Sequence, residues 1–150
     1  MSTVDEGLQA VARVREMREQ DSRHGLRLAL QEQRRREEDA RRYLDRIEQA
    51  PSFVTGSTAD FQAGRAALAS LSSALTTAQQ QIAAGRVVTE SAREHWQSDK
   101  TRLNAVEMLL ERRAAERAAA ADRAEAKELD DIGARLWLRR RKKKNSEVPR

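Results

Sequence analysis

This 150-residue chain contains two long segments with a heptad repeat, and one short stretch of turn-forming residues separates them. In the second segment apolar or small residues recur in alternating steps of three and four, and only Asp99 interrupts the row with a charge. An average step of 3.5 residues keeps one stripe of a helix facing a partner helix, as in a left-handed coiled coil. The row consists of Phe61, Gly64, Leu68, Leu71, Leu75, Ala78, Ile82, Gly85, Thr89, Ala92, Trp96, Leu103, Val106 and Leu110.

The first segment carries the same repeat in a weaker form. Leu8, Val11 and Val14 mark an apolar face near its start, and a second row follows. That row consists of Leu26, Leu30, Gln33, Glu37, Ala40, Leu44 and Ile47. Four pairs have the i,i+4 spacing that stabilises an exposed helix by about 0.2–0.5 kcal/mol per pair: Glu19–Arg23, Glu32–Arg36, Glu37–Arg41 and Glu38–Arg42.

The stretch between the segments predicts one turn. Pro51 disfavours a helical conformation in Ala50, and Ser57 with Asp60 has the spacing of a capping box that starts a new helix. We therefore predict an all-α protein, a long antiparallel two-helix coiled-coil hairpin over 1–138 with a helix at 3–50, a loop at 51–58 and a helix at 59–138. The remaining 139–150 is predicted to be a basic, disordered tail.

A turn centred near residue 54 or 55 predicts that position i of the first helix faces about 109 − i of the second. Gly25 would then face Gly85, and residues from about 108 to 138 would form a helical overhang with no partner inside the hairpin. The coiled-coil core is expected at Leu26, Leu30, Leu44, Ile47, Phe61, Leu68, Leu71, Leu75, Ile82, Trp96, Leu103 and Val106.

Composition agrees with a narrow core. Aromatic residues make up 3% of the chain and charged residues 35%, and a two-helix coil buries only a thin seam. The absence of cysteine fits a reducing compartment. No apolar run reaches the length of a membrane span, and the start of the chain lacks the pattern of a secretory signal. We expect a cytoplasmic protein.

The net charge of +5 is concentrated at one end. Residues 139–150 hold seven Lys or Arg and one Glu, a net of +6, which leaves −1 for the other 138 residues. The run Arg139–Lys144 could meet an acidic protein or lipid surface, or nucleic acid. It contains no aromatic residue and no basic stripe continues along the helices, so nucleic-acid binding is the weaker alternative. A solvated tail without a partner is a further alternative.

Nothing in the sequence indicates catalysis or a cofactor. His24 and His95 have no metal-ligand spacing, and by the predicted register they lie about ten residues apart in level. No glycine-rich phosphate-binding motif occurs. The carboxylates lie on solvated helix faces, where desolvation does not tune an acid or base. We predict a protein that is not an enzyme and has no cofactor, metal or catalytic residue.

The stretch from Trp96 to Arg135 resembles the flagellar export protein FliJ family, a component of the flagellar type III export apparatus. The family shows a Trp-x-x-x-Lys-x-x-Leu pattern, an acid-Arg pair and a terminal apolar-Asp-acid motif. The matching residues are Trp96, Lys100, Arg102, Leu103, Leu109, Glu111, Arg112, Lys127, Leu129, Asp130, Asp131 and Arg135.

The resemblance implies a stalk similar to the two-helix part of a rotary ATPase gamma subunit, which inserts the free ends of its hairpin into the export ATPase ring and stimulates it. It also implies peripheral association with the export machine at the inner membrane and, among partners, export chaperones. The expected ATPase contacts are Leu8, Val11, Leu129, Asp130, Asp131, Ile132, Arg135 and Leu136.

The resemblance also implies contact with the export gate FlhA, carried here by Leu71 and Ala74. Ala67 and Ala78 depart from the family at this surface, where it has a large aromatic residue and a histidine. Three alternatives remain open: the equivalent stalk of a virulence type III secretion system, a nucleic-acid-binding coiled coil that uses the basic tail, and a homodimeric spacer.

Overall fold

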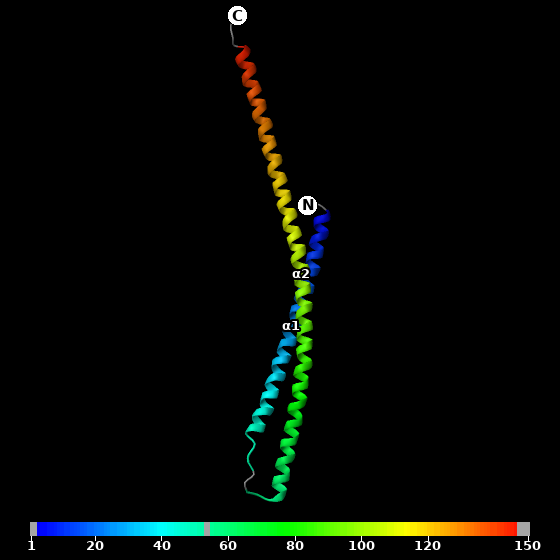
Figure 1. The fold of residues 1–150 in the computed structure, drawn as a ribbon. Helices are drawn as coiled ribbons and strands as arrows, with labels where there is room; N and C mark the ends of the chain where they lie inside the picture. Colours follow the sequence, from blue (N-terminus) through cyan, green and yellow to red (C-terminus); the bar gives the residue numbers. More distant parts are fainter. Residues whose placement is uncertain (1–2, 53–54, 147–150) are drawn as a thin grey trace. The chain divides into compact units, whose positions relative to one another are not determined.

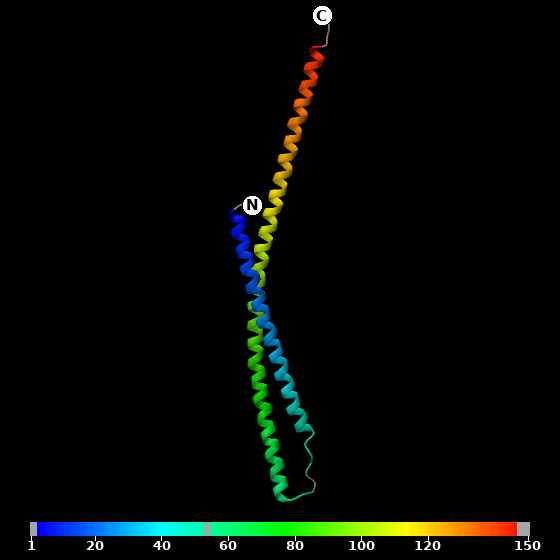
Figure 2. The same ribbon diagram turned by 180° about the vertical axis from the view of Figure 1, so that it is seen from behind.

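The computed structural model describes residues 3–52 and 55–146 and contains two long helices, α1 (Thr3–Glu48) and α2 (Thr58–Ser146). No strand occurs among these residues. The chain divides into two compact units, one of Val11–Asn104 and one of Met1–Ala10 with Ala105–Arg150. In each unit a part of α1 packs antiparallel to a part of α2 (Figures 1 and 2). The predicted fold class, an all-α hairpin of two packed helices, is confirmed.

The start of α2 is capped as the sequence predicts. The Asp60 backbone N–H donates to Ser57 Oγ at 3.2 Å, and Ser57 N–H and Oγ–H donate back to Asp60 Oδ2 at 3.2 and 2.8 Å. These two bonds from Ser57 lower the pKa of the Asp60 carboxyl. Ser57 and Asp60 therefore satisfy backbone donors that the first turn leaves without a helical partner.

The connection between the helices begins slightly earlier than predicted. α1 ends at Glu48, after which Gln49 N–H still donates to Asp45 O at 2.9 Å and Ala50 N–H donates to Ile47 O at 3.3 Å. Gly56, next to the cap of α2, has a φ of 155°, which a residue with a Cβ rarely adopts.

Burial along α2 follows the predicted row. Every third or fourth residue from Gly64 to Leu110 is buried or half-buried, and Asp99, the one charge in the row, is 4% exposed. Phe61, at the start of the row, is 48% exposed, because α1 ends before reaching this level.

The seam of α1 differs from the predicted row. Its buried and half-buried positions include a row that also alternates in steps of three and four, and this row contains many polar residues. The row is Asp5, Leu8, Ala12, Arg15, Glu19, Ser22, Leu26, Ala29, Gln33, Arg36, Ala40, Tyr43, Ile47 and Ala50. Glu37 is exposed, and Leu44 is 43% exposed because Tyr43 takes the seam position beside it. The other expected core residues, from Leu26 to Val106, are half-buried.

The predicted register is wrong by about two helical turns. Glu19 contacts Trp96 and Arg36 contacts Gln81, so the numbers of contacting residues add to 115 and 117 instead of 109. The reason is that α1 ends at Glu48 while Ala50 and Pro51 line one pocket with Gly64 and Ala67, so residues 49–52 lie alongside the first turns of α2. Gly25 consequently does not face Gly85, whose added Cβ would lie 3.3 Å from Arg36 Nη1.

The predicted end of α2 also needs correction. Residues 139–146, predicted to be disordered, continue the helix to Ser146, while 147–150 lie outside the described residues. Arg and Lys have high helix propensity, and cations near a helix C-terminus interact favourably with the helix dipole. A run of cations is therefore as compatible with a continued helix as with a disordered tail.

Candidate functional site

A buried polar contact joins the two helices within the Val11–Asn104 unit. Trp96 Nε1–H donates to Glu19 Oε1 at 2.8 Å, and Glu19 is 3% exposed. Arg23, one turn along α1, donates to both carboxylate oxygens of Glu19 at 2.7–3.0 Å, which confirms the predicted i,i+4 pair. A buried carboxylate is stable only when it is paired, and here two donors from two helices pair it.

The charge of Glu19 is favoured by its neighbours. The Trp96 donor, then the bonds and charge of Arg23 and the charge of Lys100, lower the pKa of Glu19, against burial, which raises it. Lys100 Nζ lies 5.0 Å from the centre of the Trp96 ring, within cation–π range. Trp96 and Lys100, which carried the family resemblance, thus have a structural role in holding α2 against α1.

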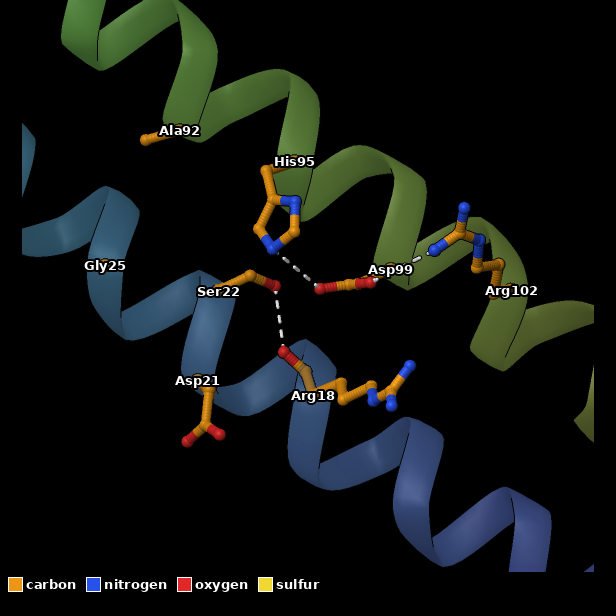
Figure 3. Close-up of a pocket in the computed structure, with 8 residues that line it drawn as sticks. All are labelled: Arg18, Asp21, Ser22, Gly25, Ala92, His95, Asp99 and Arg102. Carbon is orange, nitrogen blue, oxygen red and sulfur yellow. Dashed lines mark hydrogen bonds and ion pairs between the residues drawn. The ribbon is translucent and has the colours of Figure 1, made fainter.

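A shallow groove lies beside this contact and is drawn in Figure 3. Its lining residues are Arg18, Asp21, Ser22, Gly25, Ala92, His95, Asp99 and Arg102. Asp99 lies between His95 Nε2 at 3.5 Å and Arg102 Nη1 at 3.9 Å, both from its own helix. The Ser22 hydroxyl donates to the backbone oxygens of Arg18 and Glu19 at 3.0 and 3.2 Å. The hydroxyl is therefore engaged with backbone oxygens of its own helix.

In the structure, residues that face each other have numbers that add to 115–117, and the numbers of His24 and His95 add to 119. The two histidines therefore lie closer in level than the sequence predicts. His24 is nevertheless exposed, while His95 pairs with Asp99. Among residues 3–52 and 55–146, no group of three or more His, Cys, Asp or Glu side chains is arranged to hold a metal ion.

In the other unit, an ion-pair cluster joins the first turn of α1 to α2. Asp5, 3% exposed, accepts hydrogen bonds from Arg113 Nη1 at 3.4 Å and from Arg117 Nη1. A carboxylate near a helix N-terminus also interacts favourably with the helix dipole. Burial along α2 ends at this contact, since Arg113 is half-buried and every described residue from Ala114 onward, including Arg117, is exposed.

The expected ATPase contacts lie mostly on this exposed part of α2. Leu129, Ile132 and Leu136 are 62%, 51% and 50% exposed and share one helix face through their spacing of three and four. Asp130, Asp131 and Arg135 are exposed beside them. On α1, Leu8 is half-buried in one unit, and Val11 is 44% exposed in the other.

The expected gate contacts Leu71 and Ala74 are half-buried against α1. Leu71 also forms part of a small, mainly apolar pocket at the loop end of the Val11–Asn104 unit, lined by Arg46, Gln49, Ala50, Pro51, Gly64, Ala67, Leu68 and Leu71. Ala78, at 7% exposure, belongs to the seam.

Sequence reasoning missed the polar seam residues Glu19, Ser22 and Asp5. A signal was present, because all three fall on the alternating row that contains Leu8 and Leu26. Assigning seam positions by hydrophobicity alone hides such a row, since the buried residues of this protein are mainly polar or small.

The fold and these surfaces define a class: a two-helix coiled coil whose second helix extends well beyond its pairing. A profile of the FliJ family, described as Flagellar FliJ protein, matches residues 5–142. The chain therefore belongs to the FliJ family, a non-catalytic component of the flagellar type III export apparatus. A search of curated proteins and a search of solved structures each found no match. Within the part of the chain that the structure describes, no helix is long and apolar enough to cross a bilayer.

Proposed function

We propose that this protein is a non-enzymatic stalk that binds and stimulates the flagellar export ATPase, and that the exposed part of α2 carries the contact. The observation that supports this most is the apolar face of Leu129, Ile132 and Leu136, each at least half exposed on a segment with no α1 residue against it. A ring-shaped partner that covers this face would remove apolar area from water at about 25 cal/mol per Å².

The polar residues around this face would set the orientation of the helix in its partner. Asp130 and Asp131 on one turn and Arg135 on the next would pair with opposite charges of the ATPase and set the rotation of the helix in the ring. Leu8 and Val11 on α1 are the expected additional apolar contacts. Charged groups at the rim of an interface contribute more to specificity than to affinity, so the apolar residues should dominate binding.

The test is ATP turnover by the purified cognate export ATPase with and without this protein. Wild type should stimulate turnover, and the triple variant Leu129→Asp, Ile132→Asp, Leu136→Asp should not. Val87→Asp with Val88→Asp is the matched control, because these valines are 71% and 61% exposed on α2 within the Val11–Asn104 unit. Equal stimulation by the triple variant and wild type would remove the proposal.

Coupling to the export gate is the second part of the proposal. Leu71 and Ala74 are the proposed contacts with FlhA, and the apolar pocket beside Leu71 would accept a side chain of the gate. Leu71→Ala should weaken capture of the FlhA cytoplasmic domain. Leu75→Ala is the control, since Leu75 is equally half-buried in the seam but does not line the pocket. Equal loss in both variants would indicate general destabilisation and contradict this contact.

The proposed location follows from these partners: the cytoplasmic face of the inner membrane, peripheral to the export machine. Export chaperones are further expected partners, and co-purification with flagellar chaperones from the native cell checks them.

A further inference from the structure

The exposed part of α2 is divided sharply by charge. Residues 114–131 hold six Asp or Glu and three Lys or Arg, a net of −3. Residues 132–146 hold seven Lys or Arg and no acidic residue, a net of +7. Both segments are helical and exposed at every residue (yellow to red in Figure 1). Such a cationic segment attracts an anionic partner.

Large apolar side chains lie next to these cations. Leu136, Trp137 and Leu138 are consecutive, and they are 50%, 57% and 51% exposed. Because consecutive helical residues differ by about 100° in direction, these three side chains spread over about 200° of the helix circumference. The guanidinium of Arg141 lies 5.1 Å from the centre of the Trp137 ring, so the aromatic side chain and the cations form one continuous surface.

We infer that residues 136–144 bind the surface of an anionic lipid bilayer. An acyl–headgroup boundary accepts both halves of this surface, since Leu and Trp side chains enter its apolar side while Lys and Arg reach lipid phosphates. Trp residues favour this boundary because the indole is apolar with one polar edge. Neutralising one such cation should weaken binding to an anionic bilayer about fivefold.

Nucleic acid fits the same segment less well. Phosphates would pair with the cations, but Leu136 and Leu138 would stay in water, and Trp137 is the one aromatic residue available for base stacking between 132 and 146. The bilayer satisfies the apolar and the charged residues together. This assignment shares Leu136 with the proposed ATPase contact, but it depends mainly on Trp137, Leu138 and Arg139–Lys144, which are outside the set proposed for that contact.

The experiment is co-sedimentation of the full chain with vesicles of phosphatidylcholine alone or with about one third phosphatidylglycerol. Wild type should bind the anionic vesicles, bind neutral vesicles much less, and be released by high salt. The triple variant Lys142→Gln, Lys143→Gln, Lys144→Gln should bind on the order of a hundredfold more weakly. The matched control Arg27→Gln, Arg34→Gln, Arg41→Gln removes three exposed cations of α1 and should bind like wild type.

A second measurement reports on the apolar residues. Tryptophan emission should shift to the blue on addition of anionic vesicles, and Trp137→Phe should remove that shift, because the other tryptophan, Trp96, is held in the seam. Three results would overturn the inference: no vesicle binding by wild type, binding without an emission shift, or tighter binding to duplex DNA than to anionic vesicles at equal salt.

Discussion

Two parts of one helix meet different environments in this protein. Within the Val11–Asn104 unit, α2 packs along α1 and buries Ala78, Gly85, Thr89 and Asp99. From Ala114 to Ser146 the same helix is exposed at every residue. Both parts are rich in good helix formers, so the backbone conformation does not separate them. Helix propensity therefore specifies that a helix forms, while the seam residues specify which helix it packs against.

The largest expected effect comes from placing one charge in each part. Ile82→Asp puts a carboxylate into the half-buried seam and should lower the free energy of unfolding by about 2–3 kcal/mol. Ile132→Asp, at a residue 51% exposed, should change it by less than about 0.5 kcal/mol. Thermal unfolding followed by circular dichroism compares the two, and equal destabilisation would contradict the distinction.

The next effect concerns the polar contact across the seam. Trp96→Phe removes the donor to Glu19, and Glu19→Gln removes the charge that Trp96 and Arg23 stabilise. Each change should cost about 1–2 kcal/mol, and the double variant should cost less than the sum. A double-mutant cycle by urea unfolding measures the coupling. Additive effects would show that the two residues stabilise the coil independently.

A smaller effect is expected where pairing ends. Asp5→Asn removes the charge that accepts bonds from Arg113 and Arg117. The side chains of these arginines are 36% and 50% exposed, so water replaces part of the interaction and the cost should be about 1 kcal/mol. Hydrogen exchange should increase in the first turns of α1 and remain unchanged near Glu19. Loss of protection throughout α1 would mean that this pair governs the whole seam.

Two glycine substitutions distinguish the paired region from the exposed part of α2. A Cβ at Gly25 or at Gly133 would meet nothing within 4 Å, so Ala at either position should favour helix by about 0.5–1 kcal/mol. Gly25→Ala should raise the melting temperature of the paired region, because that helix unfolds with its partner. Gly133→Ala should increase helicity without moving that transition. An increase in melting temperature from Gly133→Ala would indicate that the exposed segment unfolds with the rest.

The smallest expected effect is the pH dependence contributed by Glu19. Its pKa is held below the ordinary 4.5, first by the Trp96 donor and then by Arg23 and Lys100. The folded state therefore binds this proton less readily than the unfolded state. The stabilisation is fully present above pH 4.5 and is lost as the pH falls through the lowered pKa. Wild type should lose more stability than Glu19→Gln between pH 5 and pH 3, and parallel curves would contradict this.

Much of the fold could be predicted from the sequence. The alternating row on α2 from Gly64 to Leu110, the cap by Ser57 and Asp60, and the ion pairs Glu19–Arg23 and Glu32–Arg36 all depend on residues near one another in the chain. Local spacing is sufficient for these features because a helix repeats every 3.6 residues whatever its partner.

The register could not be predicted in the same way. It depends on where the residues that follow α1 lie, and here Ala50 and Pro51 line one pocket with Gly64 and Ala67 of α2. The choice of Glu19 as a buried residue depends in turn on the register, since Trp96 and Lys100 on the facing helix add to Arg23 in stabilising its carboxylate. The ATPase and gate residues stay predictions, because their partners decide their roles.

By itself, the sequence determined that two helices form, where each one starts and which stripe of α2 is buried. These properties follow from contacts within a few residues, whose entropic cost is small. Tertiary packing decides that α1 is shifted by about two turns along α2, that Glu19 and Asp5 enter the seam, and that the pairing of α2 ends near Arg113 and Arg117. A heptad stripe is nearly unchanged by a shift of whole repeats, so only specific cross-helix pairs such as Glu19–Trp96 distinguish one register from the next.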